Sequence, residues 1–133
     1  MNKHLYKKLL RAQSDEITEH YIYLRLAARE KEPSNRKVLE RIAADEKDHY
    51  GIWKNQTGTR VSPSMFLVLF CLLLARLFGM IFAVKLMEKG ENLAQRNYEK
   101  IGEYLPEALE IMREEKKHEF DFIKNSWFAK YGG

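Results

Sequence analysis

Hydrophobic residues recur every three or four positions along most of the chain, which is the spacing of an amphipathic helix rather than of a strand. The first such stripe stops before Pro33. The second follows Ser34, a residue that can cap a helix, and stops at the turn-forming residues 55–58. The pattern therefore predicts helices over residues 3–31 and 35–55.

A third helix has a clear start signal at Ser62 and Pro63, since Ser offers a capping oxygen and Pro at the first helical position loses no hydrogen bond. The hydrophobic pattern then continues without a strong stop signal, so we expect one long helix over residues 63–102. Gly79 and Gly90 are the places where this helix can kink or change its packing partner.

The last part of the chain predicts a fourth helix, which Pro106 opens and which covers residues 106–129. With 133 residues the chain has the size of one domain, residues 1–133. Its seven Gly and three Pro leave little room for a turn-rich β architecture. We therefore expect an all-α protein, a four-helix bundle whose third helix begins with a long apolar extension.

The apolar extension begins at Met65, ends at Val84 and is interrupted by Arg76. A helix that is apolar on nearly every side can be a membrane span, a surface for a partner or a membrane interface, or a helix buried in a dimer. An Arg near the middle would cost about 2.5–3.5 kcal/mol at a bilayer centre, which disfavours the span. Because a second copy of the chain can cover the helix, we expect a homodimer through residues 65–84.

Charge and cysteine content narrow the classes of function. The formal net charge of +4 arises from interspersed basic and acidic residues, so we expect no nucleic-acid partner. The single cysteine, Cys71, excludes an intramolecular disulfide and a Cys-x-x-Cys metal centre, and we expect an inert buried thiol. The start of the chain lacks a secretory signal, so we expect a cytoplasmic protein that touches a membrane only at its periphery.

Two Glu-x-x-His motifs are the strongest chemical signal in the sequence. Glu46 and His49 lie in the second predicted helix, and Glu115 and His118 lie in the fourth. The three-residue spacing places each carboxylate and its imidazole on one helix face. One such motif is expected by chance in a chain this rich in charge, whereas two on alternate helices indicate a shared site.

The other two predicted helices each offer a glutamate that is followed seven residues later by a tyrosine. Glu16 precedes Tyr23 in the first helix, and Glu91 precedes Tyr98 in the third. The two halves of the chain therefore match as a weak internal repeat with a pseudo-twofold axis. Four glutamates and two histidines that face one bundle core are a ligand set for two divalent iron or manganese ions.

Each of these residues also has an ordinary structural interpretation. Surface glutamates commonly pair with Lys or Arg, a buried histidine commonly bonds a backbone carbonyl, and a tyrosine commonly fills the core. A small helix rotation would also exchange the chosen glutamates for their neighbours Glu19, Glu88, Glu114 or Glu119. The symmetry of the set favours the metal site, and the match with Glu91 favours Glu16.

These motifs resemble the rubrerythrin branch of the ferritin-like family, over most of the chain apart from the apolar extension. The resemblance implies a di-iron carboxylate centre with the ligands Glu16, Glu46, His49, Glu91, Glu115 and His118. It implies that Glu46 and Glu115 bridge or ligate the metals and that each histidine serves one iron. Tyr23 and Tyr98 match family tyrosines that hydrogen-bond ligand carboxylates and thereby orient them.

Two departures from the family pattern limit what the resemblance implies. Ala94 stands where rubrerythrins usually have a further glutamate, and the sequence contains no Cys-rich rubredoxin domain. Electrons are therefore expected from an external donor or from ferrous iron itself. The apolar stretch before Glu91 is similar to the ferritin-like domain fused to vacuolar-iron-transporter-type membrane proteins, which adds iron handling as a role.

The expected function is the reduction of hydrogen peroxide, or of dioxygen, by two ferrous ions held between the carboxylates. Ferroxidase activity that supplies or detoxifies iron is an alternative in the same class, and manganese-dependent catalase chemistry is another. A different class is a non-catalytic iron-binding protein whose apolar helix docks on a membrane transporter. The sequence leaves these alternatives open, because ligand sets of this kind accept several metals.

Overall fold

The computed structural model of the chain describes residues 2–103, 105, 106, 108, 110, 111, 113, 114 and 117, and for residues 91–96 it describes the backbone alone. Within this part of the chain all regular elements are helices, so the all-α prediction is confirmed. Most of the fourth predicted helix, 106–129, falls outside the described residues. Those that are described from 108 onward are helical.

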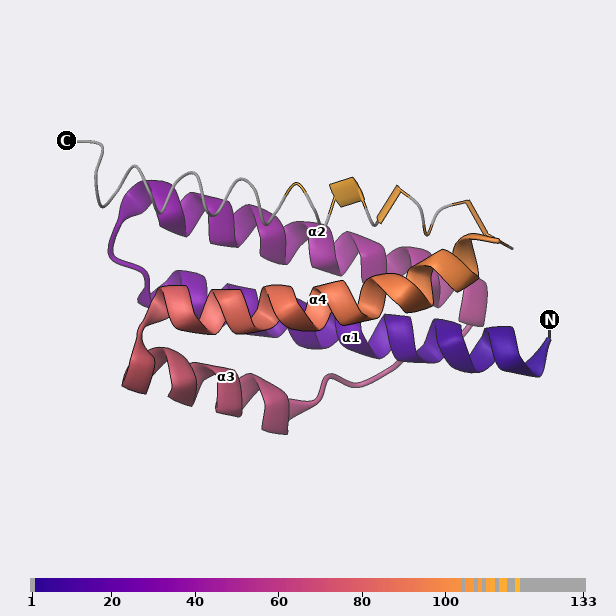
Figure 1. Ribbon diagram of the computed structural model, residues 1–133, viewed down its shortest axis with the longest axis horizontal. Helices are drawn as coiled ribbons and strands as arrows, with labels where there is room; N and C mark the ends of the chain where they lie inside the picture. Colours follow the sequence, from indigo (N-terminus) through magenta and orange to yellow (C-terminus); the bar gives the residue numbers. More distant parts are fainter. Residues whose placement is uncertain are drawn as a thin grey trace.

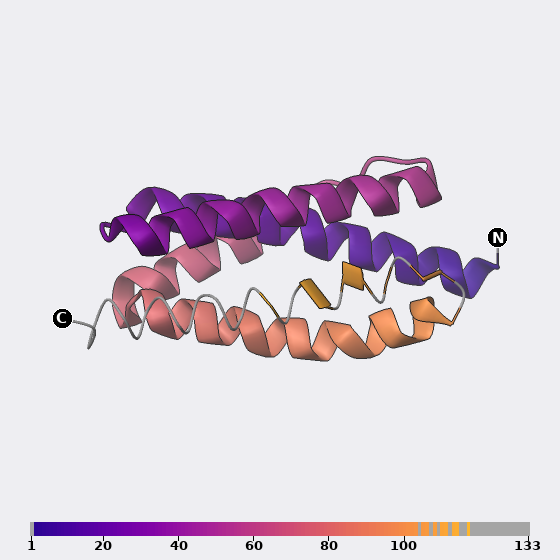
Figure 2. The same cartoon turned by 90° about the horizontal axis from the view of Figure 1, so that it is seen from above.

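Four helices have defined bounds: α1 Lys3–Arg29, α2 Pro33–Thr57, α3 Met65–Phe78 and α4 Met80–Gly102. Helices α1 and α2 run antiparallel along one another, and α4 runs lengthwise beside α1 in the opposite direction (Figure 1, Figure 2). The shorter α3 lies at the outer edge of this group (Figure 1). Because α1 contacts each of the other three helices, it is the central element of the described fold.

Local capping groups account for the bounds of the first two helices. Helix α1 begins after Asn2, whose side chain accepts a hydrogen bond from a first-turn N–H at 2.7 Å. Helix α2 begins with Pro33, and the carboxylate of Glu32 accepts from the N–H of Ser34 at 3.4 Å, so Glu32 rather than Ser34 is the cap. Gly58 ends α2 in the left-handed conformation, with φ 71°. Both helices were predicted to within two residues at each end.

The third helix begins later than its sequence signal indicates. Ser64 is the cap, since its hydroxyl accepts a hydrogen bond from the N–H of Leu67 at 3.4 Å. The N–H of Ser64 donates to the hydroxyl of Thr18 on α1 at 2.9 Å, which fixes the end of the connection to the core. Ser62 and Pro63 therefore lie in the connection, and the predicted start was two residues early.

The prediction of one continuous helix over residues 63–102 is wrong, because the chain reverses at Gly79. This residue has φ 96° and ψ 163°, a conformation that residues with a side chain rarely adopt. It ends α3 and begins α4, and Figure 1 shows the two helices running in opposite directions on either side of it. Gly90, by contrast, lies within the unbroken helix α4. Among the described residues, no helix combines the length and the apolar character that crossing a membrane requires.

The core consists of two apolar clusters at different heights along α1 and α2. One contains Leu26 of α1 and Leu39 of α2, and α3 and the first half of α4 pack against it. The other contains Leu9 of α1 and Trp53 of α2, and the last part of α4 packs against it. In both α1 and α2, the inward-facing residues between these two clusters are therefore held in the interior by apolar packing on either side.

The backbone of Gly79 generates a prediction about stability. A Cβ at this residue would meet no atom within 4 Å, so steric contact is not the problem, but the backbone conformation costs a side-chain-bearing residue about 1–3 kcal/mol. We expect Gly79→Ala to lower the free energy of unfolding by about that amount in urea titrations. The matched control is Gly51→Ala, which lies inside α2 with equal space and should stabilise by up to about 1 kcal/mol. Equal effects of the two substitutions would contradict the argument.

Candidate metal centre

Helices α1 and α2 bring three predicted metal ligands together in the interior. Glu16 comes from the middle of α1, and Glu46 and His49 lie one turn apart on the facing side of α2. Their exposed fractions are 0%, 0% and 2%. One ligand atom from each residue can be chosen so that all three atoms lie within 4.8 Å of one another. This buried group of two carboxylates and an imidazole could hold a metal ion.

The chemistry of this group fits a divalent cation. Carboxylates almost never lie fully inside a protein unless a charge or a metal compensates them, since an ion loses its hydration on burial. Oxygen and imidazole nitrogen together are ligands that iron, manganese and zinc accept. These ligand atoms therefore limit the candidates to metals of this class, but they do not distinguish among iron, manganese and zinc.

The two ring nitrogens of His49 face different partners. Nδ1 lies 3.3 Å from Oε2 of Glu16 and 3.8 Å from Oε1 of Glu46, so it faces the candidate ligands. Nε2 lies 2.6 Å from Oε2 of Glu114, which is 53% exposed. When Nε2 carries the proton and donates it to Glu114, the lone pair of Nδ1 is directed toward the other two carboxylates. Glu114 therefore positions the ring for metal binding through Nδ1.

Tyr98 of α4 closes the other side of the group. Its hydroxyl donates a hydrogen bond to Oε1 of Glu16, and its ring stacks on the indole of Trp53 with 5.9 Å between the centroids. The sequence predicted that Tyr98 bonds a ligand carboxylate, and the contact is present. Because Oε1 accepts from Tyr98, Glu16 is held with Oε2 toward His49. Tyr23 is also buried, in the apolar cluster next to the group.

The other half of the predicted ligand set is not described. The side chain of Glu91 and the residues Glu115 and His118 lie outside the described residues, so the second metal position of the prediction stays a prediction. Glu88, one helical turn before Glu91, is buried on α4. The structure thus brings together Glu16, Glu46 and His49, and it leaves the partners that the repeat assigns to them untested.

Two further residues show what the sequence alone could not. Glu114, which the sequence offered only as a neighbour of the chosen Glu115, contacts His49. His20 is buried with Nδ1 2.6 Å from the carbonyl oxygen of Ala43, which is an ordinary contact for an interior histidine. His20 has no glutamate three residues before it, whereas His49, which follows Glu46 by three residues, lies with two buried glutamates.

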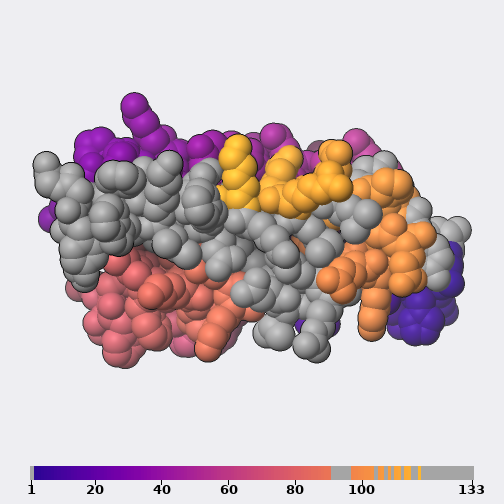
Figure 3. All heavy atoms as spheres, turned by 45° about the horizontal axis from the view of Figure 1, so that its top comes forward, coloured from indigo at the N-terminus to yellow at the C-terminus, as the bar shows by residue number. Residues whose placement is uncertain are grey.

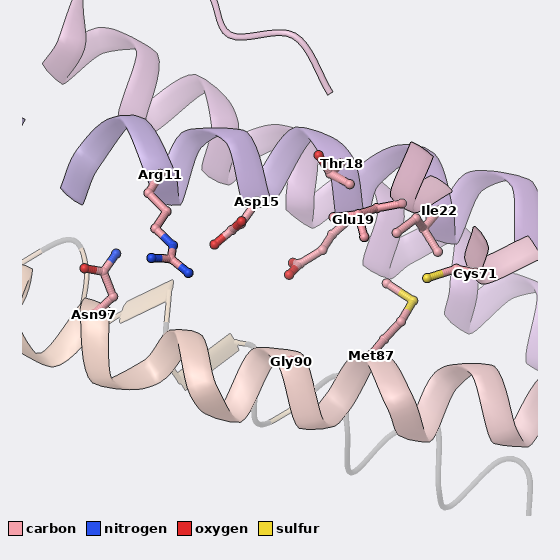
Figure 4. Close-up of a pocket in the computed structure, with 10 residues that line it drawn as sticks. Arg11, Asp15, Thr18, Glu19, Ile22, Cys71, Met87, Gly90 and Asn97 are labelled. Atoms are coloured by element: carbon pink, nitrogen blue, oxygen red, sulfur yellow. The ribbon is translucent and has the colours of Figure 1, made fainter. Parts of the chain in front are cut away.

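A cavity of about 450 Å³ lies between α1, α3 and α4 (Figure 4). Arg11, Asp15 and Asn97 line one end, and Cys71 and Met87 line the other, so the cavity is polar at one end and apolar at the other. No pattern in the sequence indicates this cavity, because its lining comes from three helices whose packing depends on the break in the third predicted helix.

Asp15, next to the candidate ligand Glu16, has a raised pKa. Burial raises the pKa of this carboxyl to about 6, the charge of Glu16 adds to the rise, and the charge of Arg11 opposes it. The pKa of Asp15 is higher in the folded chain than in the unfolded chain. The protonated carboxyl therefore contributes to the stability of the fold at low pH, and this contribution is lost as the pH rises through about 6. Asp15 therefore destabilises the metal-free fold at neutral pH.

Comparison of the chain with protein-family models, with curated proteins and with solved structures finds no match. The interpretation of the site therefore depends on its own geometry and donor chemistry, which describe a buried carboxylate–histidine group that could hold a metal ion.

The thiol of Cys71 gives a second prediction. Burial raises its pKa, so the thiolate fraction at pH 8 is smaller than that of an unfolded cysteine. We expect iodoacetamide to modify Cys71 more slowly in the folded chain than in urea, with a pH–rate profile displaced to higher pH. Mass spectrometry of the alkylated protein measures both. A profile that coincides with that of the unfolded chain would show that the thiol is in ordinary contact with water.

Proposed function

We propose that the chain is a ferritin-like four-helix bundle that binds two iron ions and reduces hydrogen peroxide with them. The observation that carries the proposal is the buried group of Glu16, Glu46 and His49, whose ligand atoms lie within 4.8 Å of one another. In di-iron bundle proteins, two helices each supply a glutamate and two others each supply a Glu-x-x-His motif. Helix α1 supplies one such glutamate, and α2 supplies one such motif.

The sequence repeat supplies the other half of the proposed ligand set. Glu91 corresponds to Glu16, and Glu115 and His118 correspond to the motif on α2. A pseudo-twofold axis through the bundle would place these ligands opposite the described group, with one histidine for each iron. The proposal of two irons per chain depends on this symmetry, whereas a single metal depends only on the described residues.

Iron held by these residues would supply the chemistry: two ferrous ions would give the two electrons that, with two protons, convert one hydrogen peroxide into two water molecules, leaving two ferric ions. The protein must then hold the ligands in place and bring protons to the site. Tyr98 fixes Glu16, and Glu114 fixes His49, so two of the described ligands are oriented before any metal binds. Return of the irons to the ferrous state requires an external donor or fresh ferrous iron.

The contact between Glu114 and His49 supports the orientation of the imidazole. The carboxylate is half exposed, whereas the imidazole that it contacts is buried beside the candidate ligands. Because Nε2 carries the proton that it donates to Glu114, the ring is held with Nδ1 toward the site, and no further proton passes inward through it.

The first experiment is an anaerobic titration of metal-free protein with ferrous iron, followed by rapid mixing with stoichiometric hydrogen peroxide or dioxygen. We expect saturation at two irons per chain and faster oxidation by peroxide than by dioxygen, followed as near-ultraviolet absorbance. Glu46→Ala should abolish tight binding, because it removes a buried ligand, whereas Glu40→Ala on the exposed side of the same helix should bind as the parent does.

The outcomes of this titration separate the alternatives. Faster oxidation by dioxygen would assign the chain to ferroxidase chemistry. Saturation at one iron per chain would support the described ligands and would contradict the symmetric second half of the ligand set. Absence of saturable binding in the folded chain would contradict the metal centre altogether.

Loss of the Tyr98 hydroxyl should weaken the site without removing a ligand. Substitution of groups that orient metal ligands typically lowers affinity about 10–100-fold, and we expect a loss of this size for Tyr98→Phe. Trp53, which stacks on Tyr98, reports binding through quenching of its fluorescence once Trp127→Phe has removed the other tryptophan. Tyr21→Phe is the matched control on α1. Equal affinities of the two tyrosine variants would show that Glu16 needs no such support.

A further inference from the structure

One surface of the molecule is apolar to an unusual degree. Apart from Leu24, every exposed large hydrophobic residue of the described chain lies on α3 or on the first part of α4. We name this set the apolar face: Met65, Phe66, Leu67, Leu69, Phe70, Leu73, Leu77, Phe78, Ile81, Phe82 and Leu86. In Figure 3 the atoms of α3 and of the first half of α4 form one continuous surface at the end of the molecule far from the N-terminus.

The apolar face belongs to helices that are packed against the core of the fold. Val68 and Leu72 anchor α3 in the core, and Cys71 and Ala75 pack against the same cluster, while the α3 residues of the apolar face are exposed. Two pairs of exposed phenylalanines lie on it: Phe66 and Phe70 stack with centroids 6.2 Å apart, and Phe78 and Phe82 contact across Gly79 at 5.1 Å. Contiguous exposed apolar surfaces of this kind mark sites of contact with a partner or a membrane.

The segment that contains the apolar face carries charge of one sign. No Asp or Glu occurs between Asp48 and Glu88, a stretch that contains the whole face. The same stretch contains the basic residues Lys54, Arg60, Arg76 and Lys85. Arg76 on α3 and Lys85 on α4 are both exposed. The two helical segments that form the face therefore contribute phenylalanine and leucine side chains together with exposed cations and no carboxylate of their own.

This combination selects between two ways of covering the face. In a symmetric homodimer the same patch meets itself, so Arg76 and Lys85 of both copies would be brought together without an acidic partner from this stretch. An anionic lipid surface satisfies both properties, since its acyl region accepts the apolar side chains and its phosphates accept the cations. We propose that the apolar face binds the chain to anionic membranes, with α3 and the start of α4 lying in the plane of the interface.

The proposal requires no unfolding of the bundle. Because Val68 and Leu72 hold α3 against the core, the face is presented as it stands, and the four phenylalanines can enter the boundary between headgroups and acyl chains. This inference is independent of the proposed di-iron function, since none of the residues of the apolar face belongs to the metal centre.

The test is flotation of the whole chain with vesicles of phosphatidylcholine mixed with phosphatidylglycerol, and with vesicles of phosphatidylcholine alone. We expect the chain to float with the anionic vesicles only, and added salt to weaken the binding. Arg76→Gln and Lys85→Gln should each lower the partition coefficient roughly fivefold. The double substitution Leu73→Gln with Phe78→Gln should lower it about tenfold or more, while Leu24→Gln, an exposed leucine on α1, should leave it unchanged.

Circular dichroism establishes that each variant is folded, so that a loss of flotation reports the surface and not the fold. Failure of the parent chain to float with anionic vesicles would overturn the proposal, and so would equal flotation of the Leu73/Phe78 and Leu24 variants. A concentration-dependent dimer in sedimentation that the Leu73/Phe78 variant dissociates, with no vesicle binding, would assign the face to a second copy of the chain instead.

Discussion

The burial of two carboxylates at one point in a helical core is the constraint that the rest of this structure must satisfy. Glu16 and Glu46 lie at zero exposure on facing helices, with apolar clusters above and below them. Two ionised carboxylates brought together away from water would repel each other, and a cation between them would relieve that repulsion. Apolar packing fixes the register of α1 on α2, and the register in turn fixes the carboxylates. Any ion that binds the folded chain and not the unfolded one would then stabilise the fold.

The features that follow from local spacing were predictable from the sequence. Helices α1 and α2 were identified because their apolar positions repeat with the helical period and because Pro and Gly residues mark their ends. Glu46 and His49 share a face for the same reason, since three residues nearly complete one turn. The family resemblance implied that Tyr98 bonds a ligand carboxylate, but it did not say which one; that the partner is Glu16 could not be read from the sequence, because the two residues are far apart in the chain.

Two features could not be predicted because they depend on tertiary contacts. The apolar pattern continues through Gly79 without a change, and a glycine within a helix costs only about 1 kcal/mol, so the sequence cannot distinguish a helical glycine from a reversal. After the reversal, α4 contacts α1. The contact of Glu114 with His49 could not be predicted for a similar reason. Adjacent residues differ by about 100° around a helix, and only the packed orientation brings Glu114 to His49, while the assignment of Glu115 as a ligand stays a prediction.

Helix α4 connects the two surfaces from which function is inferred. Its first half carries Ile81, Phe82 and Leu86 of the apolar face, and its last part carries Tyr98, which holds Glu16. If a membrane at the apolar face changed the placement of α4, the Tyr98 hydroxyl would move with it, because both lie on one helix. Linkage would then require metal binding to change membrane binding by the same factor. The break at Gly79 places α3 on the surface, and among the described helices α4 is the one that contributes to both sites.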